Sequence, residues 1–243
     1  MATRSGSAAG PRVFVLTGAG ISAESGIPTF RGVNGLWNGW RIEEVASPRA
    51  FERDPLLVWR FYSERRAGAR DKEPHAGHRA LAELEAALGE RMFLCTQNVD
   101  HLHERAGSRR VAHMHGRLFQ SRCSQPRCTL EPFDDDRVYL ERDSLPTCPR
   151  CGSLVRPHIC WFGEVPFELE RIEAALLACD LCLVVGTSGV VYPAAGFVEV
   201  AASKGARTVY IGPEEPGNSE AFDELVHGPA SVRLPEVVAG LMR

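Results

Sequence analysis

The sequence contains no apolar run long enough to cross a membrane and no large excess of one charge. Its formal net charge at pH 7 is −3, so no basic field over the whole molecule attracts nucleic acid. The first residues, Met1 to Pro11, are small and polar and lack the apolar core of a secretory signal. We therefore expect a cytoplasmic protein that binds neither a membrane nor a specific nucleic acid.

A disulfide framework is not expected either. The chain has 8 cysteines, but disulfides persist mainly in oxidising compartments, and no secretory signal is visible. Reduced thiols and metal ligation are the better interpretation. With 243 residues, of which 44% are hydrophobic, the chain can form one large domain or a large domain with a small module.

The sequence also lacks the Gly-x-Gly-x-x-Gly fingerprint of nicotinamide-dependent dehydrogenases, which makes that class a disfavoured alternative. A related pattern is present. The apolar run Val13–Leu16 predicts a buried strand, Gly18-Ala-Gly20 predicts a sharp turn, and the polar residues from Ser22 to Ser25 suit the start of a helix. A strand, a glycine turn and a helix start together predict a cradle for a phosphate group.

Polar motifs follow two further apolar runs that predict strands. Gln97-Asn-Val-Asp-His101 comes after Met92–Thr96, and Gly186-Thr-Ser188 ends the run from Leu181. Open α/β sheets place ligand-binding residues at the carboxyl ends of their strands. The alternation of short strands and helices therefore predicts a doubly wound α/β sheet with a ligand site at this edge. The alternative is that Asn98 and Asp100 are simply turn formers.

Four cysteines form two close pairs, Cys123 with Cys128 and Cys148 with Cys151, with nineteen residues between the pairs. This spacing predicts a zinc ribbon in which four thiolates surround one zinc ion. The zinc is expected to be structural, because four sulfur ligands leave no open position for chemistry. The acidic run 134–136 between the pairs is interpreted as a solvated loop.

The stretch from Pro55 to Arg66 has the pattern of an amphipathic helix. Residues three apart share a face, so Tyr62 and Arg65 point the same way. On composition alone, such a pair is the edge of a helix face.

The string Gly18-Ala-Gly-Ile-Ser-Ala-Glu-Ser-Gly-Ile-Pro-Thr-Phe-Arg-Gly32 closely resembles the NAD-binding signature of the sirtuins, which are NAD-dependent protein-lysine deacylases. The other sirtuin motifs follow in order, from about Val13 to Pro235. The resemblance implies the sirtuin fold, a Rossmann-like doubly wound parallel sheet with a small zinc-binding module. It implies a discontinuous NAD-binding domain of residues 1–34, 76–117 and 165–243. The small domain would combine a helical module, 35–75, with a zinc-ribbon module, 118–164.

The resemblance identifies His115, directly before Gly116, as the general base that takes a proton from the ribose, and a histidine titrates in the required range. It places Asn98 and Asp100 at the nicotinamide end of the cofactor as further catalytic residues. Many relatives carry asparagine where this chain has Gly212, so ribose contacts are expected from backbone or from Glu214. The implied cofactor-binding set is Gly18, Ala19, Gly20, Ile21, Ser22, Ala23, Glu24, Thr29, Phe30, Arg31, Trp37, Gln97, Asn98, Val99, Asp100, Gly186, Thr187, Ser188, Gly212, Pro213, Glu214 and Ala230.

In sirtuins an extended acyl-lysine peptide pairs with the segment that matches Arg156–Glu164, as a strand adds to an open edge. The stretch Val190–Ala195 resembles the second wall of that cleft. Cys160 stands where valine is usual. The implied substrate-binding set is Tyr62, Arg65, Cys160, Phe162, Gly163, Glu164, Val191 and Tyr192.

The Tyr62-x-x-Arg65 pair marks the class III sirtuins, including the bacterial CobB type, in which it lines the acyl-lysine pocket. A guanidinium there pairs with a carboxylate, and the tyrosine hydroxyl donates one more hydrogen bond. Thr29 agrees, because many deacetylase-type relatives carry aspartate at that place.

The resemblance therefore implies removal of succinyl and malonyl groups from protein lysines, with acetyl as a second candidate. NAD is the co-substrate, and the products are nicotinamide, O-acyl-ADP-ribose and free lysine. One structural zinc and a monomeric state are expected. The alternatives are a plain NAD-dependent deacetylase and a non-catalytic NAD- and zinc-binding scaffold.

Overall fold

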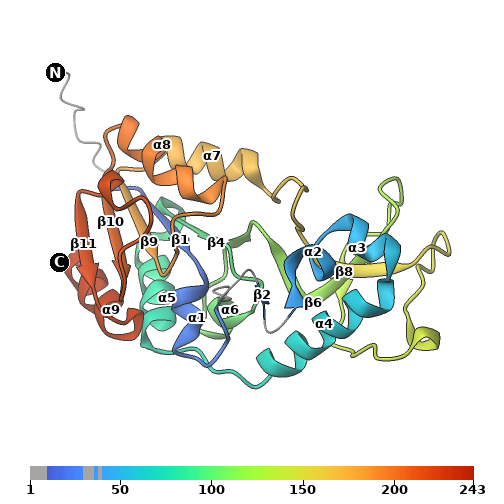
Figure 1. Cartoon of the computed structure of the whole chain (residues 1–243). Coiled ribbons are helices and arrows are strands. Elements are labelled where there is room, and N and C mark those ends of the chain that lie inside the picture. Colours follow the sequence, from blue (N-terminus) through green and yellow to red (C-terminus); the bar gives the residue numbers. More distant parts are fainter. Residues whose placement is uncertain (1–9, 30–35, 38–39) are drawn as a thin grey trace.

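The structure is a computed structural model that describes residues 10–29, 36–37 and 40–243, with backbone alone for 36–37. Figure 1 shows two lobes, a larger one that carries the C-terminus and a smaller one built around helix α4. Among the described residues, no helix combines the length and the apolar character needed to cross a bilayer.

A sheet of six parallel strands forms the centre of the larger lobe, in the order β11-β10-β9-β1-β4-β5. This arrangement confirms the predicted doubly wound α/β fold. The chain order reverses beside β1, so the ligand site of such a sheet is expected where the loops after β1 and β9 meet. The strands are β1 (Val13–Thr17), β4 (Met92–Thr96), β5 (Val111–His113), β9 (Leu181–Val185), β10 (Arg207–Gly212) and β11 (Glu224–His227).

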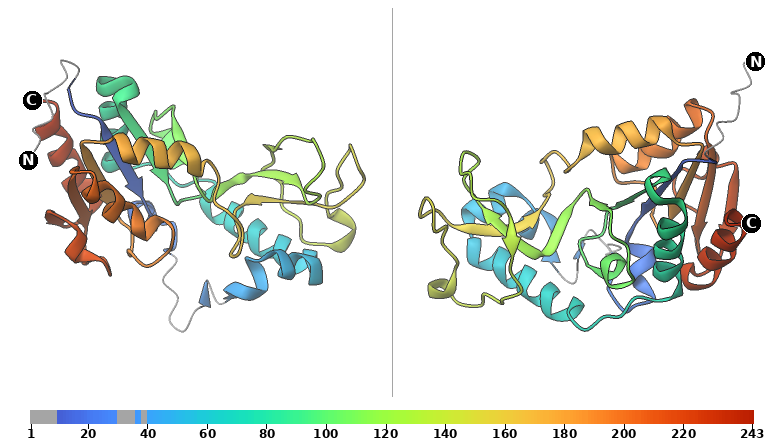
Figure 2. Two further views of the ribbon diagram at one scale, coloured as in Figure 1. Left: turned by 90° about the horizontal axis from the view of Figure 1, so that it is seen from above. Right: turned by 180° about the vertical axis from the view of Figure 1, so that it is seen from behind.

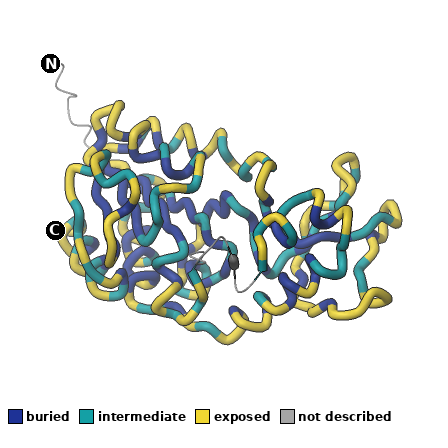
Figure 3. The backbone as a smooth tube through the Cα atoms, in the orientation of Figure 1, coloured by how far each residue is buried: buried dark blue, intermediate teal, exposed yellow. Residues whose placement is uncertain are grey.

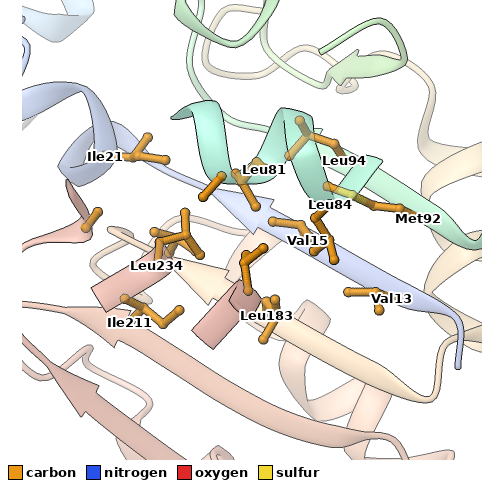
Figure 4. Packing of buried hydrophobic residues seen from close by; sticks show 14 of the residues in the cluster. Val13, Val15, Ile21, Leu81, Leu84, Met92, Leu94, Leu183, Ile211 and Leu234 are labelled. Atoms are coloured by element: carbon orange, nitrogen blue, oxygen red, sulfur yellow. The ribbon is translucent and has the colours of Figure 1, made fainter. Parts of the chain in front are cut away.

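Helices cover both faces of this sheet (Figure 2). Val15 and Leu183 point to one face and pack there against Leu81 and Leu234 (Figure 4). Phe14, the neighbour of Val15, points to the other face, because side chains alternate along a strand. The first face is covered by α1 (Ala19–Ala23), α5 (Ala76–Leu88) and α9 (Ala230–Leu241). The second face is covered by α7 (Leu169–Ala178) and α8 (Phe197–Ser203). A short helix, α6 (Leu102–Arg105), follows β4 in the chain.

The smaller lobe combines helices with a three-stranded antiparallel sheet in the order β7-β6-β8. Its elements are α2 (Ile42–Val45), α3 (Pro48–Arg53), α4 (Pro55–Ala69), β6 (Gly116–Cys123), β7 (Phe133–Asp134) and β8 (Val155–Ile159), and a two-stranded ribbon, β2 (Leu36–Trp37) with β3 (Trp40–Arg41), precedes them. Single turns of 3-10 helix lie at η2 (Gly89–Arg91), η3 (Arg142–Ser144), η4 (Ala194–Gly196) and η5 (Ser219–Ala221).

A helix, α4, forms where an amphipathic helix was predicted, and it continues to Ala69, but it buries the polar Ser63 and Arg66 together with apolar side chains. Asp54 caps its first turn by accepting a hydrogen bond from the Leu57 N–H. The buried Arg66 donates to the Leu118 carbonyl at 2.8 Å and lies 3.4 Å from the carboxylate of Asp135. These contacts fix which face of α4 points toward the rest of the molecule.

We propose the domain limits expected from the sequence, with 35–75 and 118–164 as the small domain. In support, helices α2–α4 share one hydrophobic core with β6 and β8, while the parallel sheet has two cores of its own. The buried stretches of chain in the two lobes are visible in Figure 3.

Candidate active site

The glycine turn after β1 lies directly against the loop after β9. Gly18 donates its N–H to the Val185 carbonyl at 2.9 Å, and Gly20 donates to the Gly186 carbonyl at 2.7 Å. A Cβ atom on Gly20 would lie 2.7 Å from the Gly186 Cα, which is closer than real contacts allow. Gly186 itself has a φ of +60°, a left-handed conformation that favours glycine. The glycines therefore permit the close approach of two loops at the expected ligand edge.

The predicted start of the following helix is wrong. Helix α1 begins at Ala19, and Gly18, which has extended backbone angles, is its N-cap without any side-chain hydrogen bond. Ser22 is consequently buried near the end of α1. Glu24 is the C-cap, and its carboxylate accepts hydrogen bonds from the N–H and the hydroxyl of Ser231.

Ser22, Asn98 and Asp100 form a buried polar cluster at the carboxyl edge of the sheet. The Asn98 amide donates to the Ser22 hydroxyl and to the Gly18 carbonyl, both at 3.0 Å. The Ser22 hydroxyl donates in turn to the Asp100 carboxylate at 2.9 Å. The second Asp100 oxygen accepts the Leu102 N–H at 3.0 Å. The structure thus brings Asn98 and Asp100, which the sequence assigned to the nicotinamide end of the cofactor, together with Ser22 of the predicted cofactor-binding set.

His115 lies in the connection between β5 and β6. Its Nδ1 is 3.1 Å from the Gln97 carbonyl oxygen. A carbonyl only accepts hydrogen bonds, so Nδ1 carries the proton and Nε2 of the neutral ring keeps its lone pair. Burial lowers the pKa of His115, and the hydrogen bond to Gln97 offsets only part of that effect. The side chain is therefore neutral at pH 7 and able to accept a proton at Nε2.

Deeper residues support the turn that carries Asn98. Thr17 donates its hydroxyl proton to Thr96 at 2.8 Å, so His103, 2.9 Å from the Thr17 hydroxyl, donates from Nε2. Thr96 also accepts the Asn98 N–H at 3.0 Å. His113 contacts the Asn98 carbonyl through Nδ1 at 3.1 Å and the Glu104 carboxylate through Nε2 at 2.7 Å. Sequence reasoning missed the role of the two threonines, although both end buried apolar strands.

The loops after β9 and β10 form the side of the site expected to bind adenosine. Gln97 donates its side-chain amide to the Thr187 hydroxyl at 3.1 Å, which joins this side to the Asn98 turn. A Cβ on Gly212 would lie 2.4 Å from the Tyr210 hydroxyl, so an asparagine there would require the Tyr210 side chain to move. The Tyr210 hydroxyl donates to the Thr187 carbonyl at 3.3 Å. The glycine at 212 is thus explained by its bulky neighbour on the same face of β10.

The four cysteines of the predicted ribbon come together in the smaller lobe, with all four sulfur atoms within 4.8 Å of one another. Cys123 and Cys151 have sulfurs 3.5 Å apart, and those of Cys128 and Cys148 are 3.7 Å apart. Zinc–sulfur bonds of about 2.3 Å in a tetrahedron require sulfurs about 3.8 Å apart. The four residues therefore fit a tetrahedral zinc ion.

The interpretation of the run 134–136 as a solvated loop is wrong for its central residue. Asp135 is buried and accepts hydrogen bonds from Ser121 at 2.6 Å and from Tyr139 at 3.0 Å, in addition to its contact with Arg66. Asp134 and Asp136 are exposed.

Tyr62 and Arg65 lie one turn apart on α4. Tyr62 is 0% exposed, and its hydroxyl accepts a hydrogen bond from the Trp161 indole at 2.9 Å. The Arg65 guanidinium carbon is 5.7 Å from the centre of the Tyr62 ring. Trp161 was not among the predicted site residues, although its place inside the Arg156–Glu164 motif was a usable signal.

The predicted peptide-binding residues lie in two separate environments. The Glu164 carboxylate accepts two hydrogen bonds from Arg156, at 2.7 and 2.9 Å, and therefore supports its own loop. Phe162 is half exposed, and Tyr192 is 74% exposed on the segment that precedes α8. Three predicted cofactor residues, Phe30, Arg31 and the Trp37 side chain, lie outside the described residues.

Comparison with known proteins gives concordant results. A sequence model of the Sir2 family matches residues 18–193. The NAD-dependent protein deacylase of Caulobacter vibrioides is 49% identical over 235 residues, which cover 95% of this chain and 97% of the relative. The solved complex of a Sir2 homologue with NAD matches with a TM-score of 0.85 at 41% identity, over 96% of this chain and 90% of that chain. A complex of Sir2 with a p53 peptide and NAD⁺ matches with a TM-score of 0.79 at 30% identity, over 94% and 92% of the two chains.

Proposed function

This chain belongs to the Sir2 family and is an NAD-dependent protein deacylase, and we propose that it prefers lysines whose acyl group ends in a carboxylate. The observation that carries this preference is the pair formed by Tyr62 and Arg65. The two side chains lie against each other on α4. Tyr62 is fully buried, and within residues 10–29 and 40–243 its hydroxyl accepts a hydrogen bond from Trp161 and is found to donate none.

Charge complementarity explains why a carboxylate suits this pair. Burial lowers the pKa of Arg65, and the neighbouring Tyr62 and Asp100 offset part of that effect. Arginine nevertheless stays charged in proteins, and a partly buried charge is best stabilised by a hydrogen-bonded group of opposite sign. Succinyl and malonyl groups supply such a carboxylate at their far end. An acetyl group supplies only a methyl.

For the reaction itself, we propose the roles expected from the sequence. NAD, when bound, supplies the ribose that receives the acyl group and releases nicotinamide. His115 accepts a proton at Nε2, and the Gln97 carbonyl holds its ring in the required tautomer. Asn98 and Asp100 are held in one orientation through Ser22 and position the nicotinamide end. The four clustered cysteines hold a structural zinc.

The remaining cofactor-binding and peptide-binding residues predicted from the sequence are proposed for the same roles. The acyl-lysine substrate is proposed to bind as an extended peptide beside the loop from Cys160 to Glu164. The solved complex of a Sir2 relative with a p53 peptide supports the binding of a peptide substrate.

Arg65→Met tests the acyl preference. We expect the wild type to remove succinyl from a lysine peptide with a higher kcat/KM than acetyl. The variant should lose about 10- to 10²-fold in kcat/KM for the succinyl peptide, because a charge-assisted hydrogen bond to a carboxylate contributes about 1.5–3 kcal/mol. The acetyl value should change by less than about threefold. Free lysine and nicotinamide are followed by mass spectrometry.

Arg60→Met is the matched control, because Arg60 is an exposed arginine of the same helix that contacts the Leu140 carbonyl. It should leave both rates unchanged. If the wild type removes acetyl faster than succinyl, and Arg65→Met shows the same ratio of the two rates, the protein is a plain deacetylase. Removal of no acyl group at all would favour the scaffold alternative.

The pH dependence of the reaction is expected to follow His115. A base is active in its neutral form, so kcat/KM should rise with pH through the pKa of His115 and then level off. Because burial lowers that pKa, half of the maximal rate should be reached below pH 6.5, the ordinary value for histidine. The measurement is best made between pH 5 and 8 with an acetyl-lysine peptide, whose acyl group does not titrate. A midpoint above pH 6.5 would contradict the proposed environment of His115.

A further inference from the structure

Trp161 connects the proposed peptide-binding loop to the helix that carries the acyl-selecting pair. It lies just beyond β8, is buried, and is separated in sequence from Tyr62 by 99 residues. Its indole Nε1 is 2.9 Å from the Tyr62 hydroxyl oxygen. An indole N–H can only donate, so the Tyr62 oxygen must be the acceptor in this bond.

Because the Tyr62 oxygen accepts the Trp161 N–H, its own hydroxyl proton points away from the indole. Among residues 10–29 and 40–243, no hydrogen bond from this hydroxyl to an acceptor is found. A ligand that supplies an acceptor in this direction can take a hydrogen bond from the Tyr62 hydroxyl, and a buried donor gains from such a partner. Burial also raises the pKa of Tyr62 to about 12, so the hydroxyl keeps its proton at neutral pH.

The indole ring is held firmly in place. The Arg156 guanidinium carbon lies 3.3 Å from the ring centre, and Glu164 holds that guanidinium by hydrogen bonds of 2.7 and 2.9 Å. The Trp161 backbone N–H donates to the same Glu164 carboxylate at 2.8 Å, and Phe51 packs at 5.6 Å between ring centres. The indole N–H of Trp161 therefore points in a fixed direction, and the hydrogen bond that it donates fixes the orientation of the Tyr62 hydroxyl.

We propose that Trp161 is a positioning residue for acyl selectivity, which holds the Tyr62 hydroxyl so that its proton is directed to the terminal carboxylate of the acyl group. The inference rests on the proposed function, because it adds a determinant to the same acyl pocket. Tyr62 donates one hydrogen bond to the carboxylate, and Arg65, one turn along α4, supplies the positive charge. Trp161 touches neither the acyl group nor the reacting atoms.

Trp161→Phe tests the proposal, because phenylalanine keeps an aromatic ring and removes the N–H. It should raise KM for a succinyl-lysine peptide about tenfold and leave kcat, and both constants for an acetyl peptide, within about threefold. Tyr62→Phe should have a similar effect. The double variant should be no worse than Tyr62→Phe alone, because Trp161 acts through the Tyr62 hydroxyl and the two losses are then not additive.

Trp59→Phe is the matched control. Trp59 is buried in the same hydrophobic core, but its indole N–H is donated to the Val155 carbonyl at 3.0 Å. This variant should leave the ratio of succinyl to acetyl turnover unchanged. If Trp161→Phe fails to fold, a benzothiophene analogue of tryptophan at position 161 keeps the bicyclic shape and replaces the N–H by sulfur.

The outcomes separate the two proposals. If the wild type prefers the succinyl peptide and Trp161→Phe keeps the same preference, the role of Trp161 is overturned and the proposed function stays intact. Additive losses in the double variant would overturn it as well. A wild type without preference for succinyl would overturn the proposed acyl preference, and the role of Trp161 with it.

Discussion

Replacement of His115 by alanine is expected to lower kcat for lysine deacylation by about 10²–10⁴-fold, the usual contribution of a general base. The Gln97 carbonyl fixes the proton on Nδ1, so Nε2 is the atom that accepts a proton in the reaction. Alanine removes this acceptor without disturbing the buried cluster of Ser22, Asn98 and Asp100, whose hydrogen bonds do not include His115. Turnover is measured at saturating NAD and peptide, with thermal unfolding as a check on folding.

His101→Ala is the control for this variant. His101 is a half-buried histidine in the turn after β4, and its ring packs edge-on against Phe119 at 4.6 Å. Its removal should change kcat by less than about threefold. Calorimetric titration with ADP-ribose should give Kd values within about threefold for the wild type and both variants. His115→Ala that keeps more than a tenth of wild-type kcat would exclude His115 as the essential base.

The central strands and the motifs at their ends could be predicted from the sequence because their determinants are local. The apolar runs Val13–Leu16, Met92–Thr96 and Leu181–Val185 all lie in the parallel sheet, with the predicted polar residues directly after them. The zinc site could also be predicted from the spacing of the cysteines, because two close cysteine pairs are typical of ligands that share one metal ion.

Features that depend on packing between distant segments could not be predicted. The Trp161–Tyr62 hydrogen bond joins residues 99 positions apart, and no local pattern encodes it. The burial of Asp135 depends on Arg66, which an acidic run by itself does not reveal. In the same way, the closeness of Gly212 to the Tyr210 hydroxyl follows from the packing of β10 and could not be predicted from the motif.

Removal of zinc, by a chelator or by Cys148→Ser, is expected to unfold the smaller lobe and to abolish turnover. Structural zinc contributes about 10–16 kcal/mol to the folding of zinc-finger peptides, which is as large as the whole stability of a typical domain. Zinc content is measured by mass spectrometry, and hydrogen exchange shows which amides lose protection. Amides of β6 and β8 should lose it first, while the parallel sheet, which has hydrophobic cores of its own, stays protected.

Removal of zinc should also change acyl selectivity, because the metal site and the acyl pocket share one hydrophobic core. Cys123 and Cys148 are buried in the same hydrophobic cluster as Tyr62 and Trp161. Without zinc, nothing joins the two segments that carry the four cysteines, so these segments separate and the packing that holds the Tyr62 hydroxyl is lost. Cys179→Ser, a buried cysteine of the larger lobe, is the control and should keep one zinc per chain. A zinc-free protein with wild-type turnover and an unchanged succinyl-to-acetyl ratio would contradict this coupling.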